Sequence, residues 1–259
     1  MTTSISDLAR IVDTAAAHRS EIDMLTLSEP ELTIERAYEV QAAAVRLRLE
    51  RGEKNVGMKM GLTSQAKMEQ VGVREPIFGR LTDAMLVADG ATIMIDELIH
   101  PRIEPEIAFI MKNDLVGSVS PAQAATAVEG VCAALEIIDS RYRDFTFTLP
   151  DVIADNTSAS RFVLGSRLAP IAGMELGNLG IVMESDGRIR EIASSAAVLD
   201  NPLRSLAALA GMLARRGESI HAGDIILSGG ATAAIDFRAG DHVRASIEMI
   251  GTVEVWGGV

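Results

Sequence analysis

The first part of the chain follows a helical hydrophobic pattern. Residues 5–18 and 33–51 carry apolar side chains three or four positions apart, which places them on one face of an α-helix. The run "NVGMKMGL" at 55–62 is typical of a strand, and "SQAKMEQVG" predicts a short helix with Ser64 as its N-cap. We therefore predict an α-rich N-terminal region over residues 1–75.

Short β-type runs dominate residues 76–259, which we predict to be a β-rich catalytic domain, either separate from the first region or continuous with it. A hairpin turn is expected at "SDG" (185–187), and one helix at 202–216, which begins at Pro202. The predicted fold class is α+β, with a mixed, mostly antiparallel β-roll or barrel-like core. The strand-like runs are "ATIMID", "IEPEIAFIM", "CAALEII", "SRFVLG", "GIVMES", "GDIILSGG" and "HVRASIEMIGTVEVW".

Two acidic residues interrupt the predicted strand "RIEPEIAF" (102–109). Side chains two positions apart on a strand point the same way, so Glu104 and Glu106 share one face, while Ile103 and Ile107 share the other. Neighbouring like charges on a half-buried surface repel each other. A positive charge is therefore expected between the two carboxylates.

A third carboxylate, Glu136, lies inside the apolar run "AALEIID". Three carboxylates on two strands suit the preference of Mg²⁺ or Mn²⁺ for oxygen ligands, so Glu104, Glu106 and Glu136 are candidate metal ligands. The alternative is that these glutamates face solvent or pair with Arg102 and Arg141.

Lys59 is the candidate acid–base or anion-binding residue. Alternation places it on the strand face opposite Met58 and Met60, and the glycines at 57 and 61 permit close approach of other backbone. The alternative is an ordinary surface lysine.

Two polar segments are further candidates for binding an anion. In "VIADNTSASRF" (152–162), Asn156, Ser158 and Arg161 could bind a substrate carboxylate, although the segment could equally be an ordinary polar loop. In "LSGGATAA" (227–234), the backbone N–H groups of Gly229 and Gly230 give a weak anion-nest signal.

Composition narrows the function classes. The chain has 259 residues and a formal net charge of −12, which argues against nucleic acid as a partner. No run of about 18 apolar residues predicts a membrane span, and the N-terminus lacks the apolar stretch of a secretory signal. The single Cys132 lies in an apolar run. We therefore expect a cytoplasmic enzyme with a buried thiol.

Taken together, these stretches resemble the fumarylacetoacetate hydrolase superfamily, and more closely its hydratase/decarboxylase branch from meta-cleavage catabolism of aromatic compounds. The resemblance implies a divalent-metal site at the three glutamates, a catalytic Lys59, and a carboxylate contact near Ser158. The matching stretches run in order over about residues 57–234: "GMKMGLTSQAKMEQVGV", "PIFGRLTDAM", "HPRIEPEIAF", "LEIIDSRY", "VIADNTSASRFVLG" and "LSGGATAA".

Ile77 in "PIFG" favours one activity within that branch. The branch's 2-oxopent-4-enoate hydratases typically have an acid there, whereas its 4-oxalocrotonate decarboxylases have an apolar residue, and "DSRYRDFTF" (139–147) is also more similar to the decarboxylases. The resemblance thus implies Mg²⁺- or Mn²⁺-dependent decarboxylation of a dicarboxylic 2-oxo acid, 2-oxohex-3-enedioate, with Ile77 in the catalytic site. The alternatives are a hydratase and a non-catalytic partner subunit. A homo-oligomer is expected, as is association with the hydratase of the next step.

Overall fold

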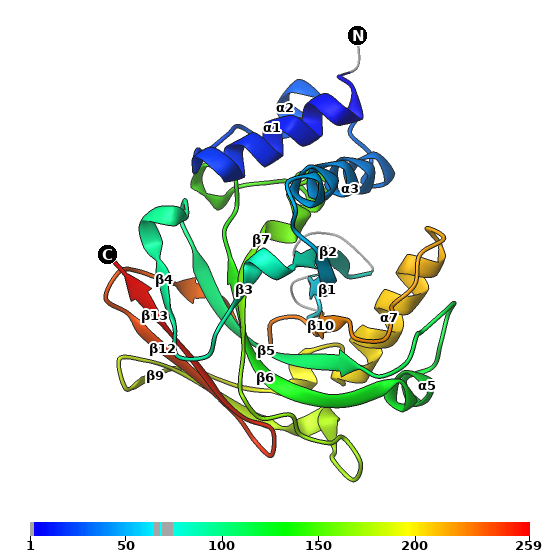
Figure 1. The fold of residues 1–259 in the computed structure, drawn as a ribbon, viewed down its shortest axis with the longest axis vertical. Helices are drawn as coiled ribbons and strands as arrows, with labels where there is room; N and C mark the ends of the chain where they lie inside the picture. The colour runs from blue at the N-terminus through cyan, green and yellow to red at the C-terminus, as the bar shows by residue number, and fades with distance from the viewer. Residues whose placement is uncertain (1–2, 65–67, 69–74) are drawn as a thin grey trace.

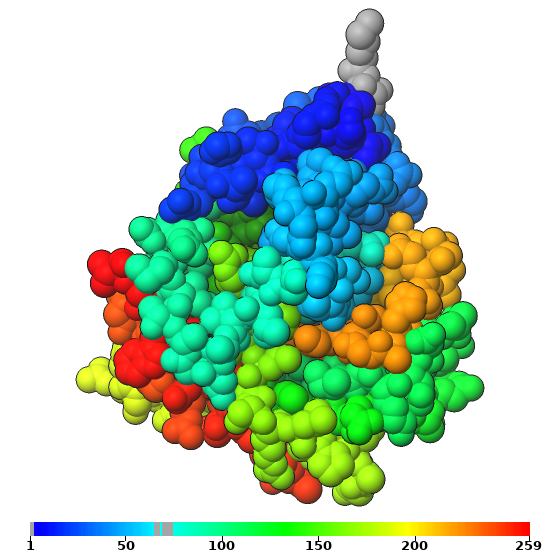
Figure 2. All heavy atoms as spheres, in the orientation of Figure 1, coloured from blue at the N-terminus to red at the C-terminus, as the bar shows by residue number. Residues whose placement is uncertain are grey.

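In the computed structural model, the described residues are 3–64, 68 and 75–259. The N-terminal part is helical, as predicted, with α1 packed on α3. Ser4 begins α1 by accepting a hydrogen bond from the Asp7 N–H, and Thr33 does the same for α3. These helices cover one end of the molecule, as Figures 1 and 2 show in blue. Their bounds are α1 Ile5–His18, α2 Leu25–Ser28 and α3 Ile34–Glu50.

The larger sheet of the described part curls below these helices in the order β2-β1-β10-β5-β6-β7-β3, with β11 paired to β5 (Figure 1). Most of its pairs are antiparallel, but β1 runs parallel to β10 and β3 to β7. β1 lies between β2 and β10, so the N-terminal 75 residues contribute a strand to this sheet. The bounds are β1 Asn55–Gly61, β2 Ile77–Thr82, β3 Leu86–Val87, β5 Arg102–Met111, β6 Val128–Ile138, β7 Ala159–Leu164, β10 Ile225–Leu227 and β11 Ile235–Asp236.

A second sheet in the described residues runs in the order β4-β13-β12-β8-β9. The hairpin predicted at "SDG" is confirmed: Asp186 and Gly187 both have positive φ, as a tight two-residue turn between β8 and β9 requires. The mixed, mostly antiparallel, rolled β core is therefore confirmed. The bounds are β4 Thr92–Met94, β8 Gly180–Ser185, β9 Arg188–Ser194, β12 His242–Ile247 and β13 Gly251–Gly258.

The predicted helix at 202–216 is α7, which ends at Ala214. Three short helices were not predicted, α2, α5 (Pro121–Thr126) and α6 (Leu149–Ala154), and α5 and α6 each have a capping box at the first turn. The helix predicted at "SQAKMEQVG" lies almost entirely outside the described residues. Short 3₁₀ turns complete the chain at Asp83–Met85, Ile95–Glu97, Arg143–Phe145, Asn156–Ser158, Leu176–Asn178 and Ser195–Ala197.

The two faces of β5 and β6 meet different surroundings. Ile103, Ile107 and Leu135 pack in the main apolar core, whereas the glutamates project from the opposite face. Cys132 is a buried free thiol, as predicted. Among the helices that the structure describes, none is long and apolar enough to cross a membrane.

Candidate active site

Three buried carboxylates converge between two paired strands. The antiparallel register places Glu104 on β5 directly opposite Glu136 on β6, and Glu106 follows two residues later on the same face. Each of the three offers an oxygen, and these oxygens all lie within 4.8 Å of one another. Glu106 and Glu136 are fully buried and Glu104 nearly so. Strand alternation thus correctly predicted the convergence of this acidic triad.

Two glycines after β10 hold the triad in position. The Gly229 N–H donates a 2.7 Å hydrogen bond to Glu106 Oε2, so the anion at this suspected nest is one of the protein's own carboxylates. Gly230 lies so close to Glu104 that an added Cβ would stand 1.9 Å from its Oε2. Only glycine leaves room for the Glu104 carboxylate here.

Lys59 completes the buried cluster. Its Nζ lies 2.9 Å from Glu136 Oε2 and donates a 3.1 Å hydrogen bond to the Thr157 carbonyl. The side chain reaches the triad because β1 pairs with β10, which pairs with β5. Lys59 is 2% exposed, so the surface-lysine alternative is wrong. The ion pair between Lys59 and Glu136 was not predicted, because nothing local in the sequence reveals which strands become neighbours.

Burial and mutual repulsion set the titration of the cluster. Burial raises the pKa of Glu106 well above its ordinary value, and the charges of Glu136 and Glu104 raise it further. The pKa of Glu136 is also raised, mainly by burial, with Lys59 opposing the shift. Burial alone would lower the pKa of Lys59, but the three glutamates outweigh it and the pKa is raised. One lysine is thus too little positive charge for three buried carboxylates.

The donor set fits a hard divalent cation. Glu106 Oε1 and Glu136 Oε1 are buried and have no hydrogen-bond partner among the described residues. Such oxygens are costly to bury unless something positive contacts them. A set of carboxylate oxygens is what Mg²⁺ and Mn²⁺ prefer, and three ligands leave coordination positions for water or substrate.

Ahead of β7, three consecutive non-glycine residues adopt left-handed backbone geometry: φ is 50° at Asn156, 55° at Thr157 and 56° at Ser158. Such a run is rare for L-residues and costs free energy. Side-chain bonds fasten it to β2, because the Asn156 amide bonds both backbone groups of Arg80 and Thr157 Oγ1 donates to the Phe78 carbonyl. The turn therefore fixes the Thr157 carbonyl that accepts from Lys59.

Ile77 lies beside this strained turn, and Ser158 is its last residue. Ile77 is buried and paired with Gly61, where an added Cβ would meet Ile77 Cγ1 at 3.2 Å and Thr157 Cγ2 at 2.7 Å. Ser158 Oγ is buried without a hydrogen-bond partner among the residues described. An apolar side chain and a spare hydroxyl therefore stand next to the lysine and its carbonyl partner.

The other candidate residues point elsewhere. Arg161 pairs in register with Ile137, whose side chain lies on the sheet face opposite Glu136. Arg102 and Arg141, the alternative partners for the glutamates, form ion pairs with Asp236 and Asp155 instead. Of the predicted site residues, the structure thus brings together the triad and Lys59, with Ile77, Asn156 and Ser158 at the adjoining turn. It does not bring Arg161 to them.

The chain is similar in sequence or in structure to several known proteins. The chain is 46% identical over 249 residues to a 4-oxalocrotonate decarboxylase of a Pseudomonas species, covering 96% of each chain. A 2-hydroxyhexa-2,4-dienoate hydratase of Comamonas testosteroni is 36% identical over 234 residues, 89% of each chain. The solved 4-oxalocrotonate decarboxylase of Pseudomonas putida G7, complexed with magnesium and adipate, superposes with a TM-score of 0.96 and 40% identity. That match covers 99% of this chain and 100% of the other.

The family comparison covers the same region. The sequence profile of the fumarylacetoacetate (FAA) hydrolase C-terminal family matches residues 48–255. This span includes β1 with Lys59, both strands of the acidic triad and the glycines that support it. The match and the relatives together show that the chain belongs to the fumarylacetoacetate hydrolase family.

Proposed function

We propose that this protein decarboxylates 2-oxohex-3-enedioate (4-oxalocrotonate) to 2-hydroxypenta-2,4-dienoate and CO₂. The observation that carries the proposal is the buried triad with Lys59, in a chain 46% identical to a 4-oxalocrotonate decarboxylase. The hydratase relative is less similar, at 36% identity. The solved relative with magnesium also holds adipate, a six-carbon dicarboxylate, as the proposed substrate is.

Glu104, Glu106 and Glu136 would hold one Mg²⁺ or Mn²⁺, because an oxygen of each lies within 4.8 Å of the other two, and Glu106 Oε1 and Glu136 Oε1 have no hydrogen-bond partner among the described residues. When bound, the ion supplies Lewis acidity to the substrate's 2-oxo group. The ion also provides the positive charge that one lysine cannot supply to three buried carboxylates.

The protein's own residues would then guide the electron pair and the proton. Loss of CO₂ from C6 leaves an electron pair at C5, which the C3=C4 bond carries toward the oxygen on C2. The Lys59 ammonium, held by Glu136 and the Thr157 carbonyl, is placed to donate a proton to that developing negative charge. One proton taken up at oxygen gives 2-hydroxypenta-2,4-dienoate.

Two neighbouring side chains would distinguish the two ends of the substrate. Ile77 offers an apolar wall, which favours neutral CO₂ over a charged carboxylate. The unpartnered Ser158 hydroxyl is available to a substrate carboxylate. Asn156 would act through the backbone that it clamps, because both ends of its amide already bond Arg80.

Association with other chains forms part of the proposal. We propose a homo-oligomer that also binds the hydratase of the next step, because 2-hydroxypenta-2,4-dienoate is that enzyme's substrate. Size-exclusion chromatography with light scattering, with and without the hydratase, measures both associations. A monomeric protein that never co-elutes with the hydratase would contradict them.

One paired assay tests the activity. The protein with Mg²⁺ is incubated separately with 2-oxohex-3-enedioate and with 2-hydroxypenta-2,4-dienoate, and CO₂ release and water addition are measured independently. We expect CO₂ from the first substrate and little hydration of the second. Efficient hydration without CO₂ release would instead establish the hydratase alternative. Metal binding without either turnover would favour a non-catalytic partner subunit.

A further inference from the structure

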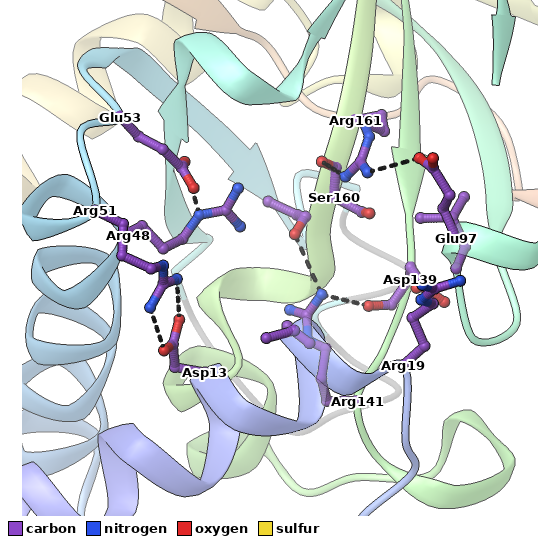
Figure 3. Close-up of a pocket in the computed structure, with 14 residues that line it drawn as sticks. Asp13, Arg19, Arg48, Arg51, Glu53, Glu97, Asp139, Arg141, Ser160 and Arg161 are labelled. Carbon is purple, nitrogen blue, oxygen red and sulfur yellow. Dashed lines mark hydrogen bonds and ion pairs between the residues drawn. The ribbon is translucent and has the colours of Figure 1, made fainter. Parts of the chain in front are cut away.

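A hollow of about 370 Å³ lies where α1 and α3 meet the sheet at the start of β7. We call it the arginine pocket, because five arginines line it; Figure 3 shows them around the hollow: Arg19, Arg48, Arg51, Arg141 and Arg161. No member of the acidic triad and no Lys59 lines it. Arg161 reaches it from the sheet face opposite Glu136. The pocket is therefore separate from the proposed metal centre.

Two of these arginines already pair with carboxylates of the protein. Arg51 forms two 2.7 Å hydrogen bonds with the Asp13 carboxylate. Arg141 is buried and bonds the Asp155 side chain and backbone carbonyls, including that of Asp139. These two residues shape the wall and leave little donor capacity for a ligand.

Arg48 and Arg161 are engaged only in part. Arg48 gives its Nε to Glu53 Oε2 at 2.9 Å, and Figure 3 shows its terminal amino groups pointing into the hollow. Those amino groups have no hydrogen-bonded partner in the part of the chain that the structure describes. Arg161 Nη1 donates a 3.1 Å hydrogen bond to the Ser160 carbonyl, whereas its Nη2 lies 3.7 Å from the nearest oxygen of Glu97, too far for a hydrogen bond. Two guanidinium groups therefore present free donors to one cavity.

The surroundings of Arg161 disfavour its charge in the unliganded protein. Burial lowers its pKa, and the positive charge of Arg48 lowers it further, although Glu97 opposes this. Two cations that are close enough to repel each other, and that still have N–H donors without an acceptor, are stabilised by an anion between them.

The acids around the pocket do not fill this role. Asp139 accepts hydrogen bonds from the backbone N–H groups of Ile99 and His100 at 2.9 and 2.8 Å. Asp13 is held by Arg51, and Glu53 also accepts from Thr82 Oγ1. Glu97 is the remaining competitor, and its side chain is 55% exposed.

We propose that the arginine pocket binds a small multivalent oxyanion, either phosphate-like or dicarboxylate, through the terminal amino groups of Arg48 and Arg161. Both ligand types present several oxygens to two planar guanidinium groups, which is the geometry that arginine recognises best. The ligand would occupy the seam between the N-terminal helices and the sheet, where it would join the two.

Isothermal titration calorimetry with inorganic phosphate and with succinate tests the proposal. Titrations use the wild-type protein and the Glu106→Gln variant, so that succinate bound at the metal centre is recognised by its loss in that variant. We expect at least one anion to bind both proteins with one site per chain. Binding of phosphate alone identifies a phosphate-bearing ligand, and binding of succinate alone identifies a dicarboxylate.

Three variants assign the binding to the pocket. Arg48→Gln and Arg161→Gln should each weaken binding on the order of 10-fold, because each removes a charge-assisted partner. Arg204→Gln, which removes an exposed arginine outside the pocket, should leave binding unchanged. Glu97→Gln should tighten binding, because it removes the competing carboxylate. Since the Glu97 side chain is largely exposed, this substitution changes no buried group. No binding of either anion to wild type, or equal affinity in all variants, would overturn the proposal.

Discussion

Lys59 Nζ and Glu136 Oε2 lie 2.9 Å apart, and both side chains are buried. The two residues come from strands that are 77 positions apart at this pair, and no local motif joins them. One lysine thus stands against three buried carboxylates. The protein therefore neutralises the negative charge of the site only in part, and the function of the site depends on what supplies the remaining positive charge.

Lys59→Ala tests the lysine as a proton donor. We expect kcat to fall by roughly 10²-fold or more, because a positioned acid is lost from the transition state. Lys54→Ala, which removes an exposed lysine just before β1, is the matched control. Steady-state kinetics with 2-oxohex-3-enedioate measures the effect. Unchanged kcat in Lys59→Ala would leave this lysine a purely structural role.

Glu106→Gln tests the metal centre. We expect Mg²⁺ affinity to fall by more than the ~10–100-fold typical of losing a second-shell partner, with loss of activity. The metal-free variant should be at least as stable as wild type, since one of three repelling carboxylates is gone. Calorimetric titration and thermal unfolding with and without Mg²⁺ measure both effects. Glu129→Gln, on an exposed position of β6, is the control. Wild-type-like titration of Glu106→Gln would refute the ligand assignment.

Gly230→Ala tests the support behind Glu104. The added methyl would stand 1.9 Å from Glu104 Oε2, so the carboxylate or the loop must move. We expect weaker Mg²⁺ binding and lower activity. Gly211→Ala, a glycine whose added Cβ meets only Ser118 Oγ at 3.6 Å, should change neither. Equal metal affinity in the two alanine variants would show that the loop yields without moving Glu104.

Ile77→Asp tests the apolar wall. A new carboxylate near the departing one should slow decarboxylation by about 10-fold or more, because it opposes the substrate's charge. Ile77→Asn is a control of the same size without the charge, and it should be less impaired. CO₂ release measures both variants. If the two variants lose activity equally, polarity or size rather than charge is what matters at this position.

Asp155 gives a pH-dependent contribution to stability. Burial raises its pKa from 3.8 to about 6, and Arg141 limits the rise. Since the folded protein binds this proton more tightly than the unfolded chain, wild type should lose stability relative to Asp155→Asn as pH rises from about 4 to about 6. The loss should be about 3 kcal/mol, with no further change above that range. Urea unfolding of both proteins across this interval measures it, and a wild-type stability that rises relative to the variant as pH increases would contradict it.

The features predicted correctly from the sequence are those that depend on local periodicity. Alternation on one strand was enough to put Glu104 and Glu106 together, and an acid in an apolar run singled out Glu136. Helical spacing likewise predicted α1, α3 and α7. Each of these inferences needs only the positions of neighbours within one element.

The features that were missed depend on contacts between distant segments. α6 is the exception, because its signal is local: Pro150 lies in its first turn, and Thr148 forms a capping box with Asp151. The left-handed turn contains no glycine, so the sequence carries no sign of it; its stability comes from bonds to β2. Because contacts with β2 cannot be seen in the sequence, the Asn156 amide was predicted to bind substrate, whereas in the structure it bonds the backbone of Arg80.

The register of β5 against β6 limits how this enzyme can change during evolution. Because Glu104 faces Glu136 while Ile103 faces Ile137, inserting or deleting one residue next to Glu104 would exchange the glutamates and the core side chains at once. A one-residue change of length beside the glutamates would therefore disturb the acidic cluster and the core together. Substitutions that keep the strand length, such as those at Ile77, alter the surroundings of the cluster without that double cost.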